Sequence, residues 1–323
     1  MTRTLMAALM MFVAANSVHA QTILLVPDSG NNRVSAFSAF DGSIIDLDFI
    51  ADDAVFADDG TEITASTLDT PINAIASGRG TIFVSDQDEG VFEYDFNGNL
   101  IGNVAGPTQG IGQVQGIETR GDSLFANSAE GADSVQEFNL VTGAQSTWTT
   151  TNLNGINDIL FRENDVLISN FFSDNIERYD LDGNFLSTFV DGDQDDGIDF
   201  PLQIHEASNG DILAAGLSTP GGIYRYDSDD GTLIEFIDVG SVRGVHELEN
   251  GNLLFSSAGL GVVVLDLETG AQTEITRGVE IGTWRSIEAV TIAVPEPSGV
   301  LLVTIVALPA MLVRRKRQMF RQR

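Results

Sequence analysis

The sequence lacks cysteine entirely and has only three histidines among 323 residues. The protein therefore has no disulfides and no thiol nucleophile. It also contains no phosphate-binding glycine loop and no G-x-S-x-G elbow. Basic residues are scarce: residues 21–297 hold all 47 acidic residues but only nine of the 16 basic ones, a net charge of −38. Such a surface repels nucleic acid and anionic lipid.

One sequence motif recurs six times along the chain. It consists of an aliphatic residue, an aromatic or aliphatic residue three positions later, Asp or Asn, and then a turn glycine. These glycines are spaced 56, 45, 40, 48 and 39 residues apart, at Gly42, Gly98, Gly143, Gly183, Gly231 and Gly270. The copy between Gly155 and Asp193 contains four short runs rich in β-branched and aromatic residues, which predicts a four-stranded antiparallel unit. Four-stranded repeats of about 40 to 50 residues are typical of β-propeller blades.

We therefore expect an all-β, six-bladed β-propeller that forms one domain, residues 21–293. The first copy has only three strands, residues 23–50, and an acidic linker follows at residues 51–70. The segment 283–292 has the pattern of a blade's first strand, so we expect it to complete the first blade and close the ring. This pattern resembles the NHL-type and gluconolactonase-type propellers.

Both ends carry apolar segments in which we expect helices. Arg3, an apolar run and the small residues before Gln21 are typical of a secretory signal peptide, residues 1–20. At the other end Pro295, Glu296 and Pro297 precede an uncharged apolar run, residues 299–313, and a basic cluster. The basic cluster marks the cytoplasmic side of a membrane.

These three parts in this order, residues 294–323, resemble the PEP-CTERM sorting signal of Gram-negative bacteria. The resemblance implies an exosortase as the processing partner and export across the inner membrane. It also implies attachment through residues 299–313 before processing and an envelope-associated or extracellular location afterwards, often in bacteria that make exopolysaccharide. An ordinary single-span tail anchor is the alternative.

The first strand of each propeller blade lines the central channel. We aligned the six expected first strands on their apolar anchor and found a polar residue two positions before it in every strand: Asn73, Gln115, Asn157, Gln203, Arg243 and Arg285. This ring is either a water-filled wall or a small-ligand site. In the second case Arg243 and Arg285 bind a carboxylate, a phosphate or a uronic acid through forked hydrogen bonds. Trp284 either stacks on a sugar there or packs between blades.

The same ring argues against a lactonase-like metal site. Propellers similar to gluconolactonase hold a catalytic divalent ion with Glu, Asn and Asp at the matching positions. Here those positions carry no carboxylate and two of them carry arginine, which repels a cation. Asp158 is the nearest acid, and strand alternation predicts that it points away from its neighbour Asn157. We expect no catalytic residues at these positions.

Two His-Glu pairs lie on the expected first strands of blades 5 and 6, at His205-Glu206 and His246-Glu247. If they met in the channel they would form an acid/base pair. The alignment offsets the two histidines by one residue, however, and predicts that they face different ways.

An acidic loop between blades 4 and 5 is a degenerate calcium-loop match. Its candidate Ca²⁺ ligands are Asp191, Asp193, Asp195, Asp196 and Asp199. The turn glycine falls at the seventh position and no bidentate glutamate follows at the twelfth, so a solvated acidic loop is the alternative.

These observations favour a non-catalytic, exported propeller that binds a glycan, a matrix polymer or a protein partner at the bacterial envelope. The alternative is a lactonase-like hydrolase or lyase that uses the channel mouth. The fold does not decide between them, because propellers host both kinds of function.

Overall fold

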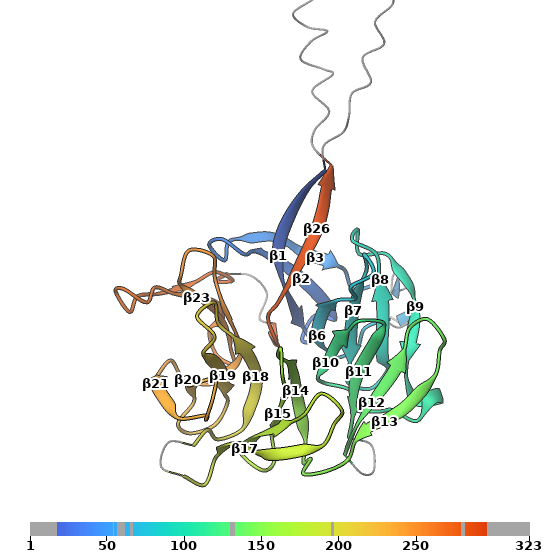
Figure 1. Cartoon of the computed structure of the whole chain (residues 1–323). Helices are drawn as coiled ribbons and strands as arrows, with labels where there is room; N and C mark the ends of the chain where they lie inside the picture. Colours follow the sequence, from blue (N-terminus) through green and yellow to red (C-terminus); the bar gives the residue numbers. More distant parts are fainter. Residues whose placement is uncertain are drawn as a thin grey trace, which may run out of the picture. The chain divides into compact units, whose positions relative to one another are not determined.

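The computed structural model describes residues 18–53, 55–56, 62–64, 67–129, 133–194, 197–278 and 282–295. Residues 22–290 form one compact unit. Six four-stranded sheets succeed one another along the chain (Figure 1), so the expected six-bladed propeller is confirmed. A second unit comprises residues 1–21 and 291–323.

In blades 2 to 6 the four strands follow one another in chain order, each paired with the next. The strands of blades 2 and 3 are β6 (Pro71–Ala76), β7 (Ile82–Asp86), β8 (Gly90–Tyr94), β9 (Leu100–Ala105), β10 (Ile117–Arg120), β11 (Ser123–Ser128), β12 (Ser134–Asn139) and β13 (Gln145–Thr149). Those of blades 4 and 5 are β14 (Ile156–Phe161), β15 (Val166–Asn170), β16 (Asn175–Tyr179), β17 (Phe185–Asp191), β18 (Pro201–Glu206), β19 (Ile212–Gly216), β20 (Gly222–Tyr226) and β21 (Leu233–Ile237). Those of blade 6 are β22 (Val242–Glu247), β23 (Leu253–Ser257), β24 (Gly261–Leu265) and β25 (Gln272–Glu274).

Blade 1 combines the two ends of the propeller sequence, as expected. Its strands, in the order of the sheet, are β26 (Glu288–Pro295), β1 (Val18–Asp28), β2 (Arg33–Ser38) and β3 (Ile44–Ile50). Figure 1 shows β26, in red, beside β1, in blue. The C-terminal strand therefore supplies the strand that the first repeat lacks.

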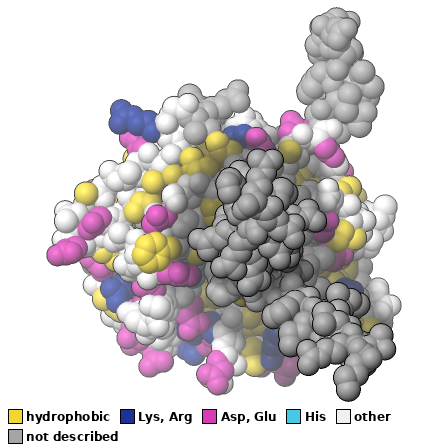
Figure 2. All heavy atoms as spheres, turned by 90° about the horizontal axis from the view of Figure 1, so that it is seen from above, with side chains coloured by type: hydrophobic (Ala, Val, Ile, Leu, Met, Phe, Trp, Pro, Cys, Tyr) yellow, Lys and Arg dark blue, Asp and Glu magenta, His cyan; other side chains and the backbone are white. Residues whose placement is uncertain are grey.

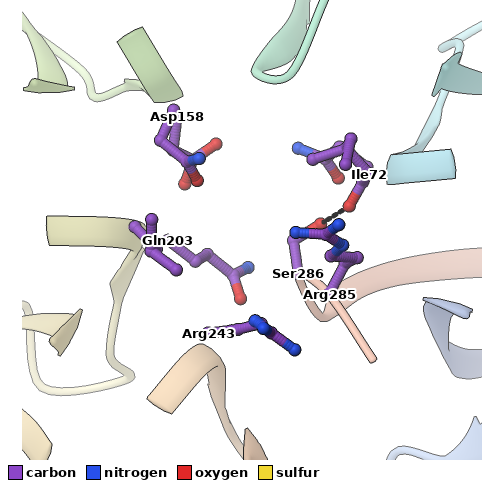
Figure 3. Close-up of a pocket in the computed structure, with 9 residues that line it drawn as sticks. Ile72, Asp158, Gln203, Arg243, Arg285 and Ser286 are labelled. Carbon is purple, nitrogen blue, oxygen red and sulfur yellow. Dashed lines mark hydrogen bonds between the residues drawn. The ribbon is translucent and has the colours of Figure 1, made fainter. Parts of the chain in front are cut away.

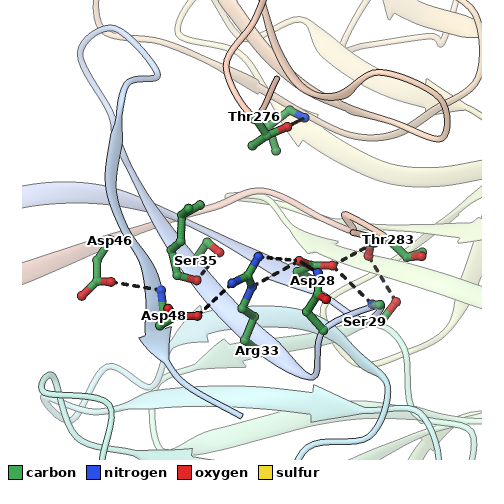
Figure 4. Close-up of polar contacts among 12 residues, drawn as sticks. Asp28, Ser29, Arg33, Ser35, Asp46, Asp48, Thr276 and Thr283 are labelled. Atoms are coloured by element: carbon green, nitrogen blue, oxygen red, sulfur yellow. Dashed lines mark hydrogen bonds and ion pairs between the residues drawn. The ribbon is translucent and has the colours of Figure 1, made fainter. Parts of the chain in front are cut away.

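The Asp28 carboxylate fastens this closure (Figure 4). Asp28 is fully buried and accepts a hydrogen bond of 2.8 Å from the backbone N–H of Thr283. It also accepts from Asn31 and forms an ion pair with Arg33, which reaches Asp48 at 2.9 Å. One buried carboxylate thus joins chain segments that are 255 residues apart.

The core lies between the blades, because the neighbouring blades cover both faces of the inner strands of each sheet. Every residue of the second strands β7, β15, β19 and β23 is buried, whereas the outer strand β3 is mostly exposed. Trp284 is 2% exposed and packs edge-on against Phe37 at 6.1 Å between ring centroids. Leu254 of blade 6 belongs to the same cluster, so Trp284 packs between blades 6 and 1.

Two short strands, β4 (Val55–Phe56) and β5 (Glu62–Thr64), pair within the acidic linker. Most of the expected terminal segments lie outside the described residues: 1–17 of the signal peptide, the apolar run 299–313, and Glu296 and Pro297 of the sorting motif. Residues 18–20, which we assigned to the signal peptide, begin β1, and Pro295 ends β26. The described part of the chain contains no helix long and apolar enough to cross a membrane.

Candidate functional site

A β-bulge interrupts the first strand of four blades near its start. In β6, β14, β18 and β22 the pairing with the second strand gains one extra residue: Ile72, Asn157, one of Leu202 and Gln203, and Arg243. A bulge places two consecutive residues opposite a single partner and breaks the alternation of side chains. Two successive residues of a first strand can therefore face the channel.

These bulges surround a cavity of about 300 Å³, counting the space open to solvent. Its lining residues come from blades 1, 2, 4, 5 and 6: Ile72, Asn73, Asn157, Asp158, Leu202, Gln203, Arg243, Arg285 and Ser286. Figure 3 shows the labelled side chains arranged around an open centre, with Ser286 donating to the carbonyl of Ile72 at 2.7 Å. The cavity marks the channel mouth where the inner strands begin.

The structure brings five of the six aligned ring residues to this cavity, and the sixth, Gln115, accepts a hydrogen bond from Asn157. The alignment was nevertheless out of register in two blades. Strand pairing places Asn73 at the position that Asp158 has in blade 4 and Gly244 has in blade 6. This position is one residue further along the strand than that of Asn157 and Arg243. Gln203 likewise lies one residue further along its strand, because the apolar anchor of blade 5 is Ile204 and not His205.

The bulge at Asn157 lets both Asn157 and Asp158 line the cavity. Their side chains turn to opposite neighbours, as expected: Asn157 donates to Gln115 of blade 3, and Asp158 is bonded to blade 5. Asp158 is 3% exposed, and its Oδ2 accepts a 2.9 Å hydrogen bond from the backbone N–H of Ile204 in the next blade. Burial raises the pKa of this carboxyl to about 8, and the charge of Glu118 adds to the effect. Asp158 is therefore largely protonated at neutral pH.

Asp158 interacts electrostatically with two carboxyl groups of other blades, Glu118 of β10 and Glu288 of β26. Burial raises the pKa of Glu118 to about 7. Burial also raises the pKa of Glu288 well above its usual range, and the charges of Asp158 and Glu118 raise it further. We refer to these three residues as the carboxyl cluster.

Our sequence analysis missed Glu118 and Glu288 because it compared only the positions before the anchor. Each of the two follows the anchor of its strand directly, after Ile117 and Ile287. A comparison extended by one residue finds an ionisable side chain there in four of the six blades: Glu118, His205, His246 and Glu288.

Arg243 and Arg285 bring two cations to the same cavity. Of the nine arginines in residues 21–297, five form ion pairs with carboxylates, and Arg79 and Arg120 donate to backbone carbonyls. Arg285 donates through Nε to Ser29 Oγ at 2.8 Å. For Arg243 the described part of the chain shows neither a hydrogen bond nor an ion pair.

Burial lowers the pKa of both guanidinium groups. For Arg285 the pKa falls to about 10, because the positive charge of Arg243 adds to the effect of burial. Each arginine therefore destabilises the charged form of the other, and an anion between them would stabilise both. The cavity wall is thus electrostatically prepared for a negative group.

Asn73 presents an unused acceptor at the same site. It is 2% exposed, and its backbone N–H donates to Ser85 Oγ at 3.0 Å. Its side-chain Oδ1 is buried and has no hydrogen-bond partner among the described residues. An unpaired buried acceptor is costly, so a ligand that brings an O–H or N–H donor gains affinity there.

Gln203, by contrast, has no hydrogen-bonding capacity to spare. Its Oε1 accepts from the backbone N–H groups of Val245 and Ile287, at 3.0 and 2.9 Å. Its Nε2 donates to the carbonyl of Ile287 at 2.7 Å and to Glu288 Oε1 at 2.8 Å. Gln203 joins blades 5, 6 and 1 and is not a free ligand group.

The prediction that the two channel histidines face different ways was wrong. The rings of His205 and His246 lie against each other, with centroids 4.1 Å apart. Strand pairing places them at equivalent positions, opposite Leu213 and Leu254. Burial lowers the pKa of His205 to about 4 and that of His246 well below its usual value, so both imidazoles are neutral at pH 7.

The acidic loop after β17 is partly described. Asp191 Oδ1 accepts from the backbone N–H of Asp193 at 3.1 Å, and its Oδ2 accepts from Gln194. Asp195 and Asp196 lie outside the described residues. Among the residues that the structure describes, no group of three acidic or histidine side chains is placed to hold a metal ion. The calcium site therefore stays a prediction.

No protein-family model matches this sequence, and no curated protein matches it either. Solved structures do share its fold. One is a protein of unknown function from Bacteroides caccae, with 16% identity, a TM-score of 0.59, and coverage of 84% of this chain and 99% of the other. Another is a chain from a nidogen/laminin complex, with 12% identity, a TM-score of 0.62, and coverage of 83% and 98%.

A third similar structure is the extracellular domain of a putative one-component system from B. thetaiotaomicron. It shows 12% identity and a TM-score of 0.51 over 80% of this chain, which spans 34% of that longer protein. At these identities the similarity establishes the propeller fold and nothing about chemistry.

Proposed function

We propose that this chain is an exported propeller that binds an acidic ligand at its channel mouth, on a glycan, a matrix polymer or a protein partner. The observation that carries the proposal is Arg243, an arginine in the cavity wall with no partner among the described residues. The protein has a formal net charge of −31, and Figure 2 shows acidic side chains scattered over the face that it draws. A cation left unpaired among so many carboxylates is well placed to bind an external anion.

The ligand also needs a hydrogen-bond donor, because Asn73 lines the same cavity and its Oδ1 has no partner among the described residues. A sugar acid meets both requirements, with a carboxylate for the two arginines and hydroxyl groups for Asn73. Planar guanidinium groups bind carboxylates through paired hydrogen bonds. An acidic glycan is therefore the ligand class that we favour over inorganic phosphate.

Export and processing rest on the sequence. We propose that residues 1–20 direct export, and that an exosortase recognises the tail at Pro295, Glu296 and Pro297 in a Gram-negative bacterium. The segment 299–313 would hold the chain in the inner membrane before processing. The extracellular domain among the similar structures supports such a location. A calcium ion at the loop of Asp191 is a further proposal.

Removing the arginines tests the binding proposal. We expect Arg243→Ala and Arg285→Ala each to weaken binding of a galacturonate oligosaccharide about 10- to 100-fold, because a hydrogen bond to a charged group contributes about 1.5–3 kcal/mol. Isothermal titration calorimetry at low salt measures this change. Arg79→Ala, a surface substitution, is the matched control and should bind like the wild type. Absence of binding by the wild type, or equal binding by all variants, would overturn the proposal.

A hydrolase or lyase is the second candidate, favoured by the raised pKa of Asp158 in the cavity, which suits a general acid. The histidine pair separates the two functions. If the protein only binds its ligand, His205→Ala with His246→Ala should leave affinity for the galacturonate oligosaccharide within about 2-fold, because both rings lie outside the cavity lining. A turnover of that oligosaccharide by the wild type that the double variant loses would establish the enzyme instead.

A further inference from the structure

The cavity that is lined by the two arginines is also lined by a carboxyl group. Asp158 lines the cavity with Arg243 and Arg285, yet it forms no ion pair with either among the described residues. Its Oδ2 is turned instead to the backbone N–H of Ile204. An acidic ligand held by the arginines therefore lies in the same small space as Asp158.

We infer that the channel mouth takes up its acidic ligand together with a proton, which the carboxyl cluster of Glu118, Asp158 and Glu288 holds in the bound state. This inference rests on the proposed function, because it concerns how the same site binds its anion. When the cluster is protonated, the site accepts an anion; when the cluster is ionised, the site rejects it.

Proximity and burial provide the physical reason. An ionised Asp158, which is 3% exposed, would place a second negative charge beside the bound anion. Repulsion between like charges is much stronger at such a buried group than in bulk water. Ligand binding and ionisation of the cluster therefore oppose each other. By linkage, the ligand raises the proton affinity of the cluster as much as the proton raises the affinity for the ligand.

Among the described residues, no cation forms an ion pair with a member of the cluster, and no arginine contributes to the shifts of their pKa values. Glu118 comes from β10, Glu288 from β26, and Arg243 and Arg285 face the cavity from blades 6 and 1. β6 contributes Asn73, which does not titrate. The histidines of β18 and β22 are neutral, because burial lowers the pKa of both.

The hydrogen bonds that the carboxyl groups accept do not offset the rise of their pKa values caused by burial. Gln203 Nε2 donates a single hydrogen bond to Glu288, and Asp158 accepts from the backbone N–H of Ile204. These hydrogen bonds fix the positions of the carboxyl groups but supply no positive charge. Burial therefore prevails, and it raises the pKa of Glu118 to about 7 and that of Asp158 to about 8.

Calorimetry of the full chain with a galacturonate oligosaccharide tests the inference. We expect affinity to fall about 10-fold between pH 6.5 and pH 8.5, because ionisation of the free site competes with binding. Titrations at pH 8 in HEPES and in Tris, which differ in ionisation enthalpy, should report about one proton taken up per ligand bound. At pH 6 they should report almost none. The ligand carboxylates stay ionised throughout, and the pKa of Arg285, about 10, lies above the range.

The double substitution Asp158→Asn with Glu118→Gln should remove the proton uptake and reduce the variation of affinity to less than about 2-fold over the same range. Glu163→Gln, which removes an exposed carboxylate, should keep the full pH dependence. Wild-type binding without proton uptake would overturn this inference and leave the arginine site standing. Uptake that persists in the double variant would also overturn it. A wild type that binds at no pH would overturn the proposed function as well.

Discussion

Replacing Gln203 by methionine is expected to lower the free energy of unfolding by about 4 kcal/mol. Methionine has nearly the same length but neither donates nor accepts these hydrogen bonds. The change leaves the backbone N–H groups of Val245 and Ile287 and the carbonyl of Ile287 buried without their partner. Each unsatisfied buried group costs about 1–3 kcal/mol.

The reason for this dependence lies in the neighbouring blades. In blades 2, 3, 4 and 6 a side chain of the second strand donates to a backbone carbonyl in the first strand of the next blade or just before it. These side chains are Ser85, Asn127, Ser169 and Ser256. The equivalent residue of blade 5 is Ala215, which has no polar group. In blade 5 the hydrogen bonds to the next blade come instead from Gln203, which lies on the first strand. Gln203 also forms hydrogen bonds with blade 1.

Guanidinium denaturation followed by circular dichroism measures the loss. Gln145→Met is the matched control, because Gln145 is exposed on the outer strand β13. Its effect should stay within about 0.5 kcal/mol. A Gln203 variant within about 1 kcal/mol of the wild type would show that the three blades do not depend on this side chain.

Asp158→Asn is expected to stabilise the protein at pH 8, by about 2 kcal/mol. The folded-state pKa of Asp158 is raised to about 8 from 3.8, so between these values the folded state binds more protons than the unfolded state. The wild type therefore loses stability as the pH rises from about 4 to about 8. At about 1.36 kcal/mol per pKa unit the upper limit is about 5 kcal/mol, and we expect less because the three carboxyl groups share the repulsion.

Denaturation of both proteins at pH 4 and at pH 8 separates this effect from a change in packing. Near pH 4 Asp158 is neutral when folded and partly neutral when unfolded, so the variant should differ from the wild type by less than about 0.5 kcal/mol. Contributions from His205 and His246 cancel when the two proteins are compared at one pH. Glu163→Gln serves as the exposed control. Destabilisation of the Asp158 variant at both pH values would contradict the assignment.

A buried carboxyl that costs stability is typical of a functional site, because activity and binding often require groups that the fold would exclude. Asp158 fits this pattern, since asparagine would keep the acceptor for Ile204 without the charge. The expected gain in stability and the expected loss of proton uptake concern the same side chain. Together they would show that the site retains its acid for the ligand and not for the fold.

The sequence by itself determined the propeller, its six blades and the closing strand. These features depend on local patterns that repeat, such as the turn glycine that Gly42 and Gly183 both provide in a left-handed conformation. The strands followed from short runs rich in β-branched and aromatic residues, separated by polar or glycine-containing turns. The closing strand followed from counting, because blade 1 lacked one strand and the segment 283–292, after blade 6, had the pattern of a first strand.

Only the tertiary structure decided what faces the channel. A bulge adds one residue to a strand without changing its apolar pattern, so the sequence did not reveal that Asp158 joins Asn157 at the cavity, or that Asn73 and Gln203 lie one residue further along their strands. The acidity of the carboxyl cluster depends on burial and on charges from three blades, which the linear sequence separates by up to 170 residues, from Glu118 to Glu288. The physical reason is that repeats record local geometry, whereas electrostatics depends on distances through space.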